Sequence, residues 1–248
     1  NNTSLEAIRC YSNSLTSLNI ANGNNSNMTY FDIRSNPNLT CIQVDDENGA
    51  YLTATSGPTE LKWQKDITAS FSNFCGDPVL LSAKVFLQGA AINPNSGEES
   101  LMRDDLRIME ATPTTSPYDS STCDASIFTI TGNDAIVDWV WVELRDAIDN
   151  TSIVSAQSAL LQRDGDVVGV DGVSPLSCNA TEDSYYVVVN HRNHLGVMSA
   201  NTVALSGTTT VLDFTDANNQ ITYGLDAQTS FGMPLDMVGM WAGNVGSD

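Results

Sequence analysis

The stretch from Ala135 to His194 constrains the fold most, because it holds a clear alternation of side chains that predicts paired strands. Within residues 136–144, one face of an extended strand collects Ile136, Val140, Val142 and Leu144, and the other collects Trp139, Trp141 and Glu143. Alternation of this kind is typical of a strand with one face in a core. The opposite face is unusually aromatic, so we expect a loop, a tail or a neighbouring chain to cover it.

Further short strands are predicted on both sides of this run. They span residues 80–87, 126–131, 135–145, 152–163, 166–170, 185–190, 202–206 and 209–214. The dipeptide Asp164-Gly165 between two apolar runs is a strong hairpin signal. Many short strands with turn signals, and no convincing helical period, predict a mainly β fold. We expect an antiparallel, immunoglobulin-like β-sandwich with a C-terminal tail over residues 77–248.

An internal repeat occupies residues 5–45. Its apolar residues follow the pattern LxxLxLxxN of leucine-rich repeats, at Leu5, Ile8, Cys10, Leu15, Leu18, Ile20, Met28, Phe31, Ile33, Leu39, Ile42 and Val44. We expect these residues to fill the core of a partial solenoid, with Asn13 and Asn36 bonding the backbone in its turns. Cys10 sits at a core position, which favours a small buried side chain over a reactive thiol.

The segments Leu15–Asn24 and Asn36–Asp45 resemble the leucine-rich-repeat surface proteins that marine and gliding Bacteroidota secrete. The resemblance extends through Trp63–Asp66 to Phe71–Cys75, which looks like the closing cap of that family. It implies a repeat segment with a C-terminal cap over residues 1–76 and a disulfide between Cys41 and Cys75. It says nothing about a ligand.

A second set of segments is similar to a module of the same large secreted proteins, and comprises Lys84–Gly89, Asp138–Arg145, Ser158–Asp166 and His191–Met198. This resemblance implies an immunoglobulin-like or prealbumin-like sandwich over most of residues 79–243. No enzymatic activity comes with it.

The repeat is short for a solenoid, because each unit buries its apolar face against the next and about three are needed for stability. Two explanations stay open. Further repeats precede residue 1, or the open end stacks on another molecule.

The composition argues against a nucleic-acid partner and favours an extracellular location. A formal net charge of −20, from 30 Asp and Glu against 10 Lys and Arg, repels phosphate backbones, so we expect no nucleic-acid partner. No long apolar run predicts membrane insertion. The few lysines and many Asn, Thr and Ser residues suggest secretion, where disulfides form. Besides the bridge implied above, we predict Cys123–Cys178 within the sandwich, which leaves Cys10 unpaired.

The cluster Asn190–His194 holds both histidines of the chain, His191 and His194, on either side of Arg192. One interpretation is a metal or ligand site near Glu182 or Asp183. At a spacing of three along a strand, however, the two rings point to different faces, and no third ligand is evident. We favour a polar strand end in which Arg192 and His194 bond loop carbonyls and carboxylates.

Calcium is the one cofactor that the sequence suggests. The segment Asp164–Asp166 lacks the spaced oxygens of a calcium loop, so the hairpin interpretation is favoured there. The C-terminal residues 241–248 resemble the start of a dockerin-like calcium loop. In that resemblance Asn244 and Asp248 supply the ligands, although Gly246 departs from the pattern and the remainder of the loop is not in the sequence.

Trp139 and Trp141, with Trp241 and Tyr223 as possible neighbours, suggest two arrangements. One is a platform on which sugar rings stack, as in a carbohydrate-binding module. The other, which we favour, is an internal seam between the sandwich and its C-terminal tail.

No catalytic arrangement emerges, since the sequence lacks GxSxG, HExxH, phosphate-loop and dinucleotide-binding patterns. We therefore expect a non-catalytic, extracellular cell-surface protein with a structural or adhesive role, in its strongest form a protomer of an extracellular filament. Its partners would be further copies of the chain or components of the cell surface and matrix. The alternative is a carbohydrate-binding accessory module of a secreted polysaccharide-degrading enzyme, with glycans as partners.

Overall fold

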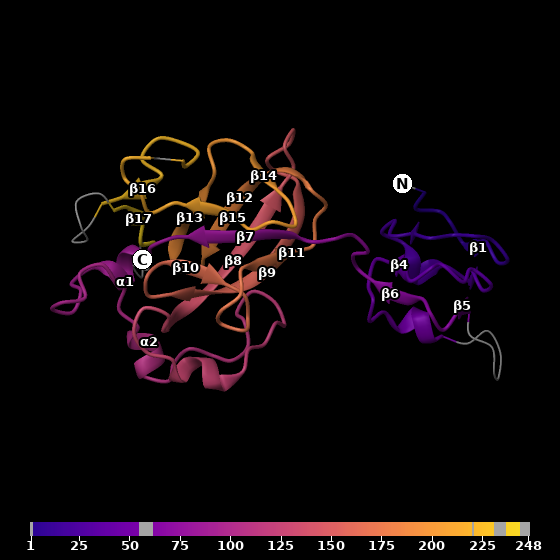
Figure 1. Cartoon of the computed structure of the whole chain (residues 1–248), viewed down its shortest axis with the longest axis horizontal. Helices are drawn as coiled ribbons and strands as arrows, with labels where there is room; N and C mark the ends of the chain where they lie inside the picture. Colours follow the sequence, from indigo (N-terminus) through magenta and orange to yellow (C-terminus); the bar gives the residue numbers. More distant parts are fainter. Residues whose placement is uncertain (1, 55–61, 220, 231–236, 244–248) are drawn as a thin grey trace, which may run out of the picture. The chain divides into compact units, whose positions relative to one another are not determined.

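The computed structural model describes residues 2–54, 62–219, 221–230 and 237–243. The chain divides into two compact units, Asn1–Gly76 and Asp77–Asp248 (Figure 1). Both units are built mainly from β-strands. The large antiparallel sheet lies in the second unit.

The first unit consists of two parallel three-stranded sheets. One sheet contains β1 (Ala7–Arg9), β3 (Tyr30–Asp32) and β5 (Trp63–Gln64), and the other contains β2 (Leu18–Asn19), β4 (Cys41–Gln43) and β6 (Ser70–Ser72). The chain changes sheet with every strand, and passes through the 3-10 helices η1 (Asn25–Asn27) and η2 (Ala50–Thr53) on the way. Residues about one repeat apart therefore become neighbours, as where Arg9 pairs with Asp32.

The apolar positions of the repeat form the core of this unit, as the sequence predicts. The second turn of the repeat is fully buried, at Met28, Phe31, Ile33, Leu39, Ile42 and Val44. The first turn is only partly buried at Leu5, Ile8, Cys10, Leu15 and Leu18. Trp63 closes the other end, with its ring centre 4.6 Å from that of Phe31 and 5.7 Å from that of Phe71.

Asparagine and aspartate side chains hold the turns of the first unit. The buried Asn36 donates from Nδ2 to the carbonyls of Ile33 (2.7 Å) and Cys10 (2.9 Å), and its Oδ1 accepts from the Leu15 N–H. Asn13 donates to the carbonyl of Cys10 at 3.1 Å. The predicted role of both asparagines in the turns is thus confirmed, because buried backbone groups need such partners.

The second unit is organised around one nine-stranded sheet. Its strands are β7 (Val79–Lys84), β8 (Ile136–Arg145), β9 (Ile153–Gln162), β10 (Asp166–Val168), β11 (Leu176–Cys178), β12 (Asp183–His191), β13 (His194–Met198), β14 (Val203–Leu205) and β15 (Thr210–Asp213). The order is β11-β7-β10-β9-β8-β12-β13, with β14 on β12 and β15 on β7. All described pairs in this sheet are antiparallel except β15 with β7. A small sheet of β16 (Gln228–Thr229) and β17 (Gly239–Met240) follows.

The hairpin predicted at Asp164-Gly165 is confirmed. Strands β9 and β10 pair in antiparallel register on either side of it. Gly165 has a φ of +95°, a conformation that residues with a Cβ rarely adopt, and an added Cβ would lie 2.9 Å from the Val85 carbonyl oxygen.

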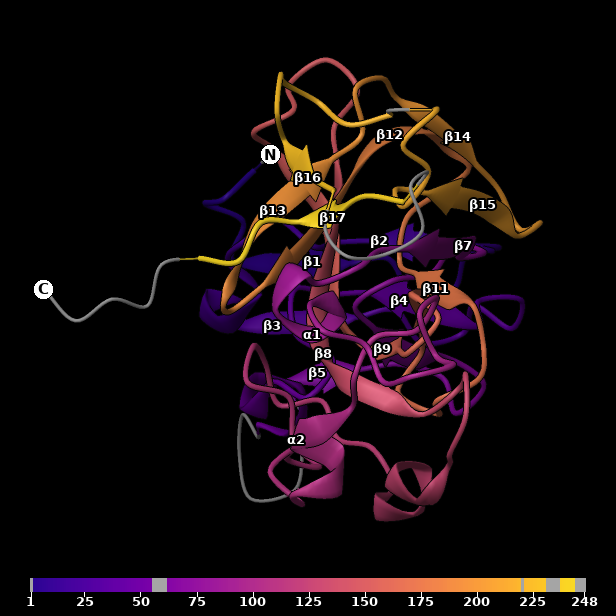
Figure 2. The same ribbon diagram turned by 90° about the vertical axis from the view of Figure 1, so that its left-hand side faces the viewer.

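The segment predicted as a strand over residues 126–131 is instead helical, and that prediction is wrong. It forms the 3-10 helix η3 (Ala125–Thr129), whose first turn is capped by the Asp124 carboxylate accepting from the Ser126 N–H at 2.8 Å. Two short α-helices, α1 (Gln88–Ala91) and α2 (Asp105–Ile108), were also not predicted. Within the second unit, α2 lies at the end away from β14 and β15 in both views (Figures 1 and 2).

Strand β8 is buried on both faces. One face contributes Val137, Val140, Val142 and Leu144 to the main core, and the other contributes Ile136 and Trp139 to a second cluster with Ile127, Leu160 and Val168. The predicted placement of Ile136 with Val140 is wrong, because the register shifts between Ile136 and Asp138. A bulge of this kind places two consecutive residues where regular pairing would place one.

The cysteines follow the predictions only in part. Cys41 and Cys75 form a disulfide, as the family resemblance implies, and Cys10 is free. The predicted Cys123–Cys178 bridge is wrong, since both thiols are free. Cys178 belongs to the main core and Cys123 packs on the second cluster, so the sheet separates them. Burial raises the pKa of Cys178 to about 12, which leaves this thiol unreactive.

We expect the Cys41→Ser/Cys75→Ser variant to lose about 2–4 kcal/mol of unfolding free energy in the first unit, because the bridge restricts the unfolded chain. Urea unfolding of residues 1–248, with and without reductant, measures this loss. Cys10→Ser serves as the matched control and should change little. A non-reducing peptide map that joins Cys123 to Cys178 would contradict the placement of the two thiols.

Candidate functional site

The outward face of the β1–β3 sheet carries the candidate site. Side chains alternate along a strand, so Ile8 and Phe31 point into the core while Arg9, Tyr30 and Asp32 lie on the opposite face. Parallel pairing places Arg9 directly beside Asp32. The site therefore follows from the repeat. Each turn of the repeat places its apolar residues in the core and the residues beside them on the outward face.

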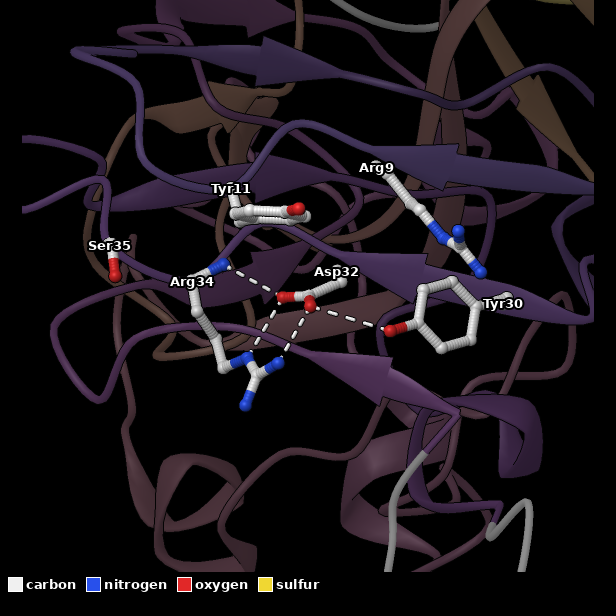
Figure 3. A pocket seen from close by; sticks show the side chains of 6 residues that line it. All are labelled: Arg9, Tyr11, Tyr30, Asp32, Arg34 and Ser35. Carbon is white, nitrogen blue, oxygen red and sulfur yellow. Dashed lines mark hydrogen bonds and ion pairs between the residues drawn. The ribbon is translucent and has the colours of Figure 1, made fainter.

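The turns that follow β1 and β3 supply the remaining residues. Tyr11 and Arg34 occupy equivalent places, and the Ser12 N–H donates to the Arg34 carbonyl at 2.9 Å. Ser12 and Ser35 both have positive φ values, 57° and 60°, which turn the chain at the same corner. Together Arg9, Tyr11, Tyr30, Asp32, Arg34 and Ser35 line a cavity of about 420 Å³ (Figure 3).

Asp32 and Arg34 form a two-pronged ion pair at the base of this cavity. Arg34 donates to the Asp32 carboxylate from Nε at 2.9 Å and from Nη2 at 2.7 Å. The Tyr30 hydroxyl also approaches the carboxylate, at 3.4 Å (Figure 3). The hydrogen bond from the Arg34 side chain holds the pKa of Asp32 below its ordinary value, although burial opposes this. The Asp32 carboxylate therefore stays charged, and both of its oxygens accept hydrogen bonds from Arg34.

Arg9 is bound differently from the other arginines. Its guanidinium carbon lies 4.7 Å from the centre of the Tyr30 ring, a cation–π contact. Each of the other six arginines has a carboxylate oxygen within 4.0 Å. Among the described residues, Arg9 has neither an ion pair nor a hydrogen-bond acceptor for its side chain. Its N–H groups are thus available to a ligand.

The chemistry of this pocket favours binding rather than catalysis. The described residues that line it offer the Arg9 guanidinium, two tyrosine rings and the Ser35 hydroxyl, whereas the Asp32 carboxylate is already paired with Arg34. Such a set can hold an oxyanion and stack against a flat ring. The sequence interpretation missed these residues. The signal was present in the repeat, because Arg9 and Asp32, like Tyr11 and Arg34, lie 23 residues apart at outward positions.

The predicted tryptophan platform is not available for sugar stacking. Trp139 is fully buried in the second cluster, and its indole N–H donates to the Pro113 carbonyl at 2.8 Å. Trp141 lies under Tyr118, with ring centres 6.0 Å apart, and donates to Glu143. The cover is therefore the loop around residues 113–130, and the predicted seam with the C-terminal tail is wrong for these two tryptophans. Trp241 bonds the Asp226 carbonyl instead, and Tyr223 is 54% exposed.

The two histidines are brought together by a hairpin. His191 ends β12 and His194 begins β13, and the two residues are paired across the strands. Their rings meet with centres 4.8 Å apart and Nδ1 atoms 2.9 Å apart. The prediction that the rings point to different faces is wrong, because a spacing of three spans a two-residue turn here rather than a single strand.

A chain of hydrogen bonds runs through this pair. His191 Nε2 lies 3.2 Å from the Asp138 carboxylate, whose two oxygens accept from Arg192 at 3.1 and 2.9 Å. The Gly89 N–H donates to His194 Nε2 at 3.0 Å. These partners assign the ring protons to Nε2 of His191 and Nδ1 of His194. Burial would raise the pKa of Asp138, but the hydrogen bond from His191 and the Arg192 charge hold it below its ordinary value.

We interpret the histidine cluster as structural. The His191 and His194 side chains line a cavity of about 290 Å³ beside Leu106 and Met109 of the α2 segment, and no Ser, Thr, Cys or Lys side chain is among the described residues that line it. Asp183 and Glu182, suggested as partners from the sequence, make no contact with either ring among the described residues. The favoured interpretation of a polar strand end fits Arg192, which binds a carboxylate, and His194, which binds a backbone N–H.

The described residues contain no group of three or more His, Cys, Asp or Glu side chains that could hold a metal ion. Asn244 and Asp248, the predicted calcium ligands, lie outside the described residues. No helix in the described part of the chain is long and apolar enough to cross a membrane.

The histidine network predicts a pH dependence of stability. Burial, and then the nearby His191, lower the pKa of His194 from 6.5 to about 4. Between these values an unfolded chain binds a proton at this residue that the folded chain does not bind. The unfolding free energy should therefore fall as the pH drops from about 6.5 toward 4.

We expect the His194→Gln variant to lose less stability than the wild type between pH 7 and pH 5, because glutamine does not titrate. The urea midpoint at both pH values measures this difference. Equal pH dependence of the two proteins would contradict the assignment. The depressed pKa of Asp138 adds a loss only at lower pH, below its ordinary value of 3.8.

Comparison with known proteins adds no family to this description. No family model, no curated protein and no solved structure matches the chain. The functional conclusions below therefore rest on the residues and their geometry.

Proposed function

We propose that this chain is a non-catalytic, extracellular cell-surface protein with a structural or adhesive role, and that its copies associate through the first turn of the repeat. In this proposal the two-sheet coil of the first unit is a partial leucine-rich-repeat solenoid and the second unit is an immunoglobulin-like sandwich. The Cys41–Cys75 disulfide supports an oxidising compartment.

The incomplete burial of the first turn carries the proposal. Leu5, Ile8, Leu15 and Leu18 are partly exposed, while the equivalent side chains one turn later are fully buried. Among the described strands, β1 pairs only with β3 and β2 only with β4, so each has one edge without a partner. A second surface of the same kind would bury the apolar row and pair the edges.

The charge distribution allows such an association. Residues 1–76 contain four Lys and Arg against seven Asp and Glu, a net charge of −3. The remaining residues contain six against 23, a net charge of −17. Contact between two first units is therefore opposed by much less repulsion than contact between two second units. A contact between two such surfaces closes a dimer, so the filament form of the proposal needs a second, different contact surface on each copy.

A carbohydrate-binding accessory module is the second candidate function. The two tryptophans do not support it, since Trp139 is buried and Trp141 is half-buried beside Tyr118. The observation that favours it now is the pocket of Arg9, Tyr11, Tyr30 and Arg34, which combines positive charge with aromatic rings.

We expect the Ile8→Glu variant to weaken self-association at least about tenfold, about 1.4 kcal/mol, because it places a charge in the apolar row. Sedimentation velocity over a range of concentrations measures the dissociation constant, and electron microscopy shows whether ordered fibres form. Ile148→Glu is the matched control, because Ile148 is 98% exposed in the second unit. Circular dichroism checks that both variants fold.

A wild-type chain that stays monomeric at millimolar concentration would contradict self-association. The same holds if Ile8→Glu and Ile148→Glu associate like the wild type.

A further inference from the structure

We propose that the pocket lined by Arg9, Tyr11, Tyr30, Asp32 and Arg34 binds an anionic saccharide, meaning a sugar ring that carries a carboxylate or a sulfate. The inference deepens the second candidate function by naming its site and its ligand class. It does not rest on self-association of the chain.

The guanidinium of Arg9 is held in place and has no protein partner for its N–H groups among the described residues. The Tyr30 ring supports it from one side at 4.7 Å. A planar guanidinium presents paired N–H groups that match two oxygens of a carboxylate or sulfate. The contact with the Tyr30 ring restricts the Arg9 side chain before the ligand arrives, so less side-chain freedom is lost on binding.

The ion pair beneath the pocket prevents Arg9 from being neutralised internally. Asp32 is the carboxylate paired with Arg9 in the strand register, but Arg34 occupies both of its oxygens. The Asp32 side chain is only 4% exposed, whereas that of Arg34 is 56% exposed. Among the described residues that line the pocket, Arg9 and Arg34 carry two positive charges and Asp32 carries one negative charge, although the chain as a whole carries −20.

The tyrosines indicate a ring-shaped ligand. Tyr11 is 55% exposed, and its ring is seen nearly edge-on in Figure 3, between the Arg34 and Arg9 side chains. Aromatic faces of this kind pack against the C–H face of a sugar. The cavity of about 420 Å³ lies within the usual range for small ligands. The described residues that line it are arginine, tyrosine, aspartate and serine, which suit a polar ring better than the apolar anchor of a peptide.

The first experiment is calorimetric titration of residues 1–248 at 0.15 M salt with a galacturonate tetramer and, separately, with a sulfated galactan oligosaccharide. The matched neutral probe is the galacturonate tetramer with its carboxylates methyl-esterified. We expect saturable binding of at least one anionic probe, and binding of the esterified tetramer at least about tenfold weaker than that of the free acid where the acid binds. Comparison of the galacturonate tetramer with the sulfated oligosaccharide shows whether the pocket prefers a carboxylate or a sulfate.

Variants then test the assignment to this pocket. We expect Arg9→Gln to weaken binding at least about tenfold, about 1.4 kcal/mol. Arg9→Lys keeps the charge but loses the planar guanidinium, so its affinity should lie between those of the wild type and Arg9→Gln. Tyr11→Leu should weaken binding by removing the stacking face. Lys84→Gln removes one positive charge in the second unit, where Lys84 pairs with Asp166, and should bind within about twofold of the wild type.

The inference is overturned if neither anionic probe binds, if the esterified tetramer binds as well as the acid, or if Arg9→Gln binds like the wild type while its circular dichroism spectrum is unchanged. Equal binding of hexaglutamate would also overturn it, in favour of an acidic peptide. Sedimentation reports self-association separately, so the two proposals can fail independently.

Discussion

The buried carboxylate of Asp138 is the interaction on which the second unit depends. It is 2% exposed and lies on a strand that is covered on both faces. An unpaired charge in such a place would cost several kcal/mol, and the structure supplies Arg192, His191 and the Trp139 N–H as donors. Because these partners come from β8 itself, from the end of β12 and from the turn between β12 and β13, the charge fixes the position of β8 against the β12–β13 hairpin.

The same carboxylate reaches further segments through its partners. The Arg192 N–H donates to the Tyr118 hydroxyl, and Tyr118 lies over Trp141 in the covering loop. His194 continues the chain to the Gly89 N–H in α1. The loop that hides the aromatic face and the helix beside the hairpin are thus tied to one buried group. This connection explains why a cluster that looks like a ligand site in the sequence has its polar atoms already occupied.

The sequence could predict features that depend on neighbours along the chain. Alternation predicted β8 and β9, and the Asp164-Gly165 dipeptide predicted the hairpin of β9 with β10. The repeat pattern predicted the core of the first unit. It could not predict features set by contacts across the fold. The bulge at Val137, the pairing of His191 with His194, and the sheet between Cys123 and Cys178 each depend on tertiary register. The Arg9 pocket was missed because outward residues carry no apolar period.

Strand β7 is the first strand of the second unit, but its pairing partners come from much later in the chain. It pairs with β10, with β11 and, through Lys84 and Asp213, with β15 near the far end of the unit. The first unit instead closes by short steps, such as Arg9 with Asp32 and Cys41 with Ser70. During synthesis the contacts of the first unit can therefore form early, while the apolar face of β7 stays exposed until its last partner emerges. The chain thus has its most non-local, and therefore slowest, pairing in the strand that directly follows the locally closed first unit.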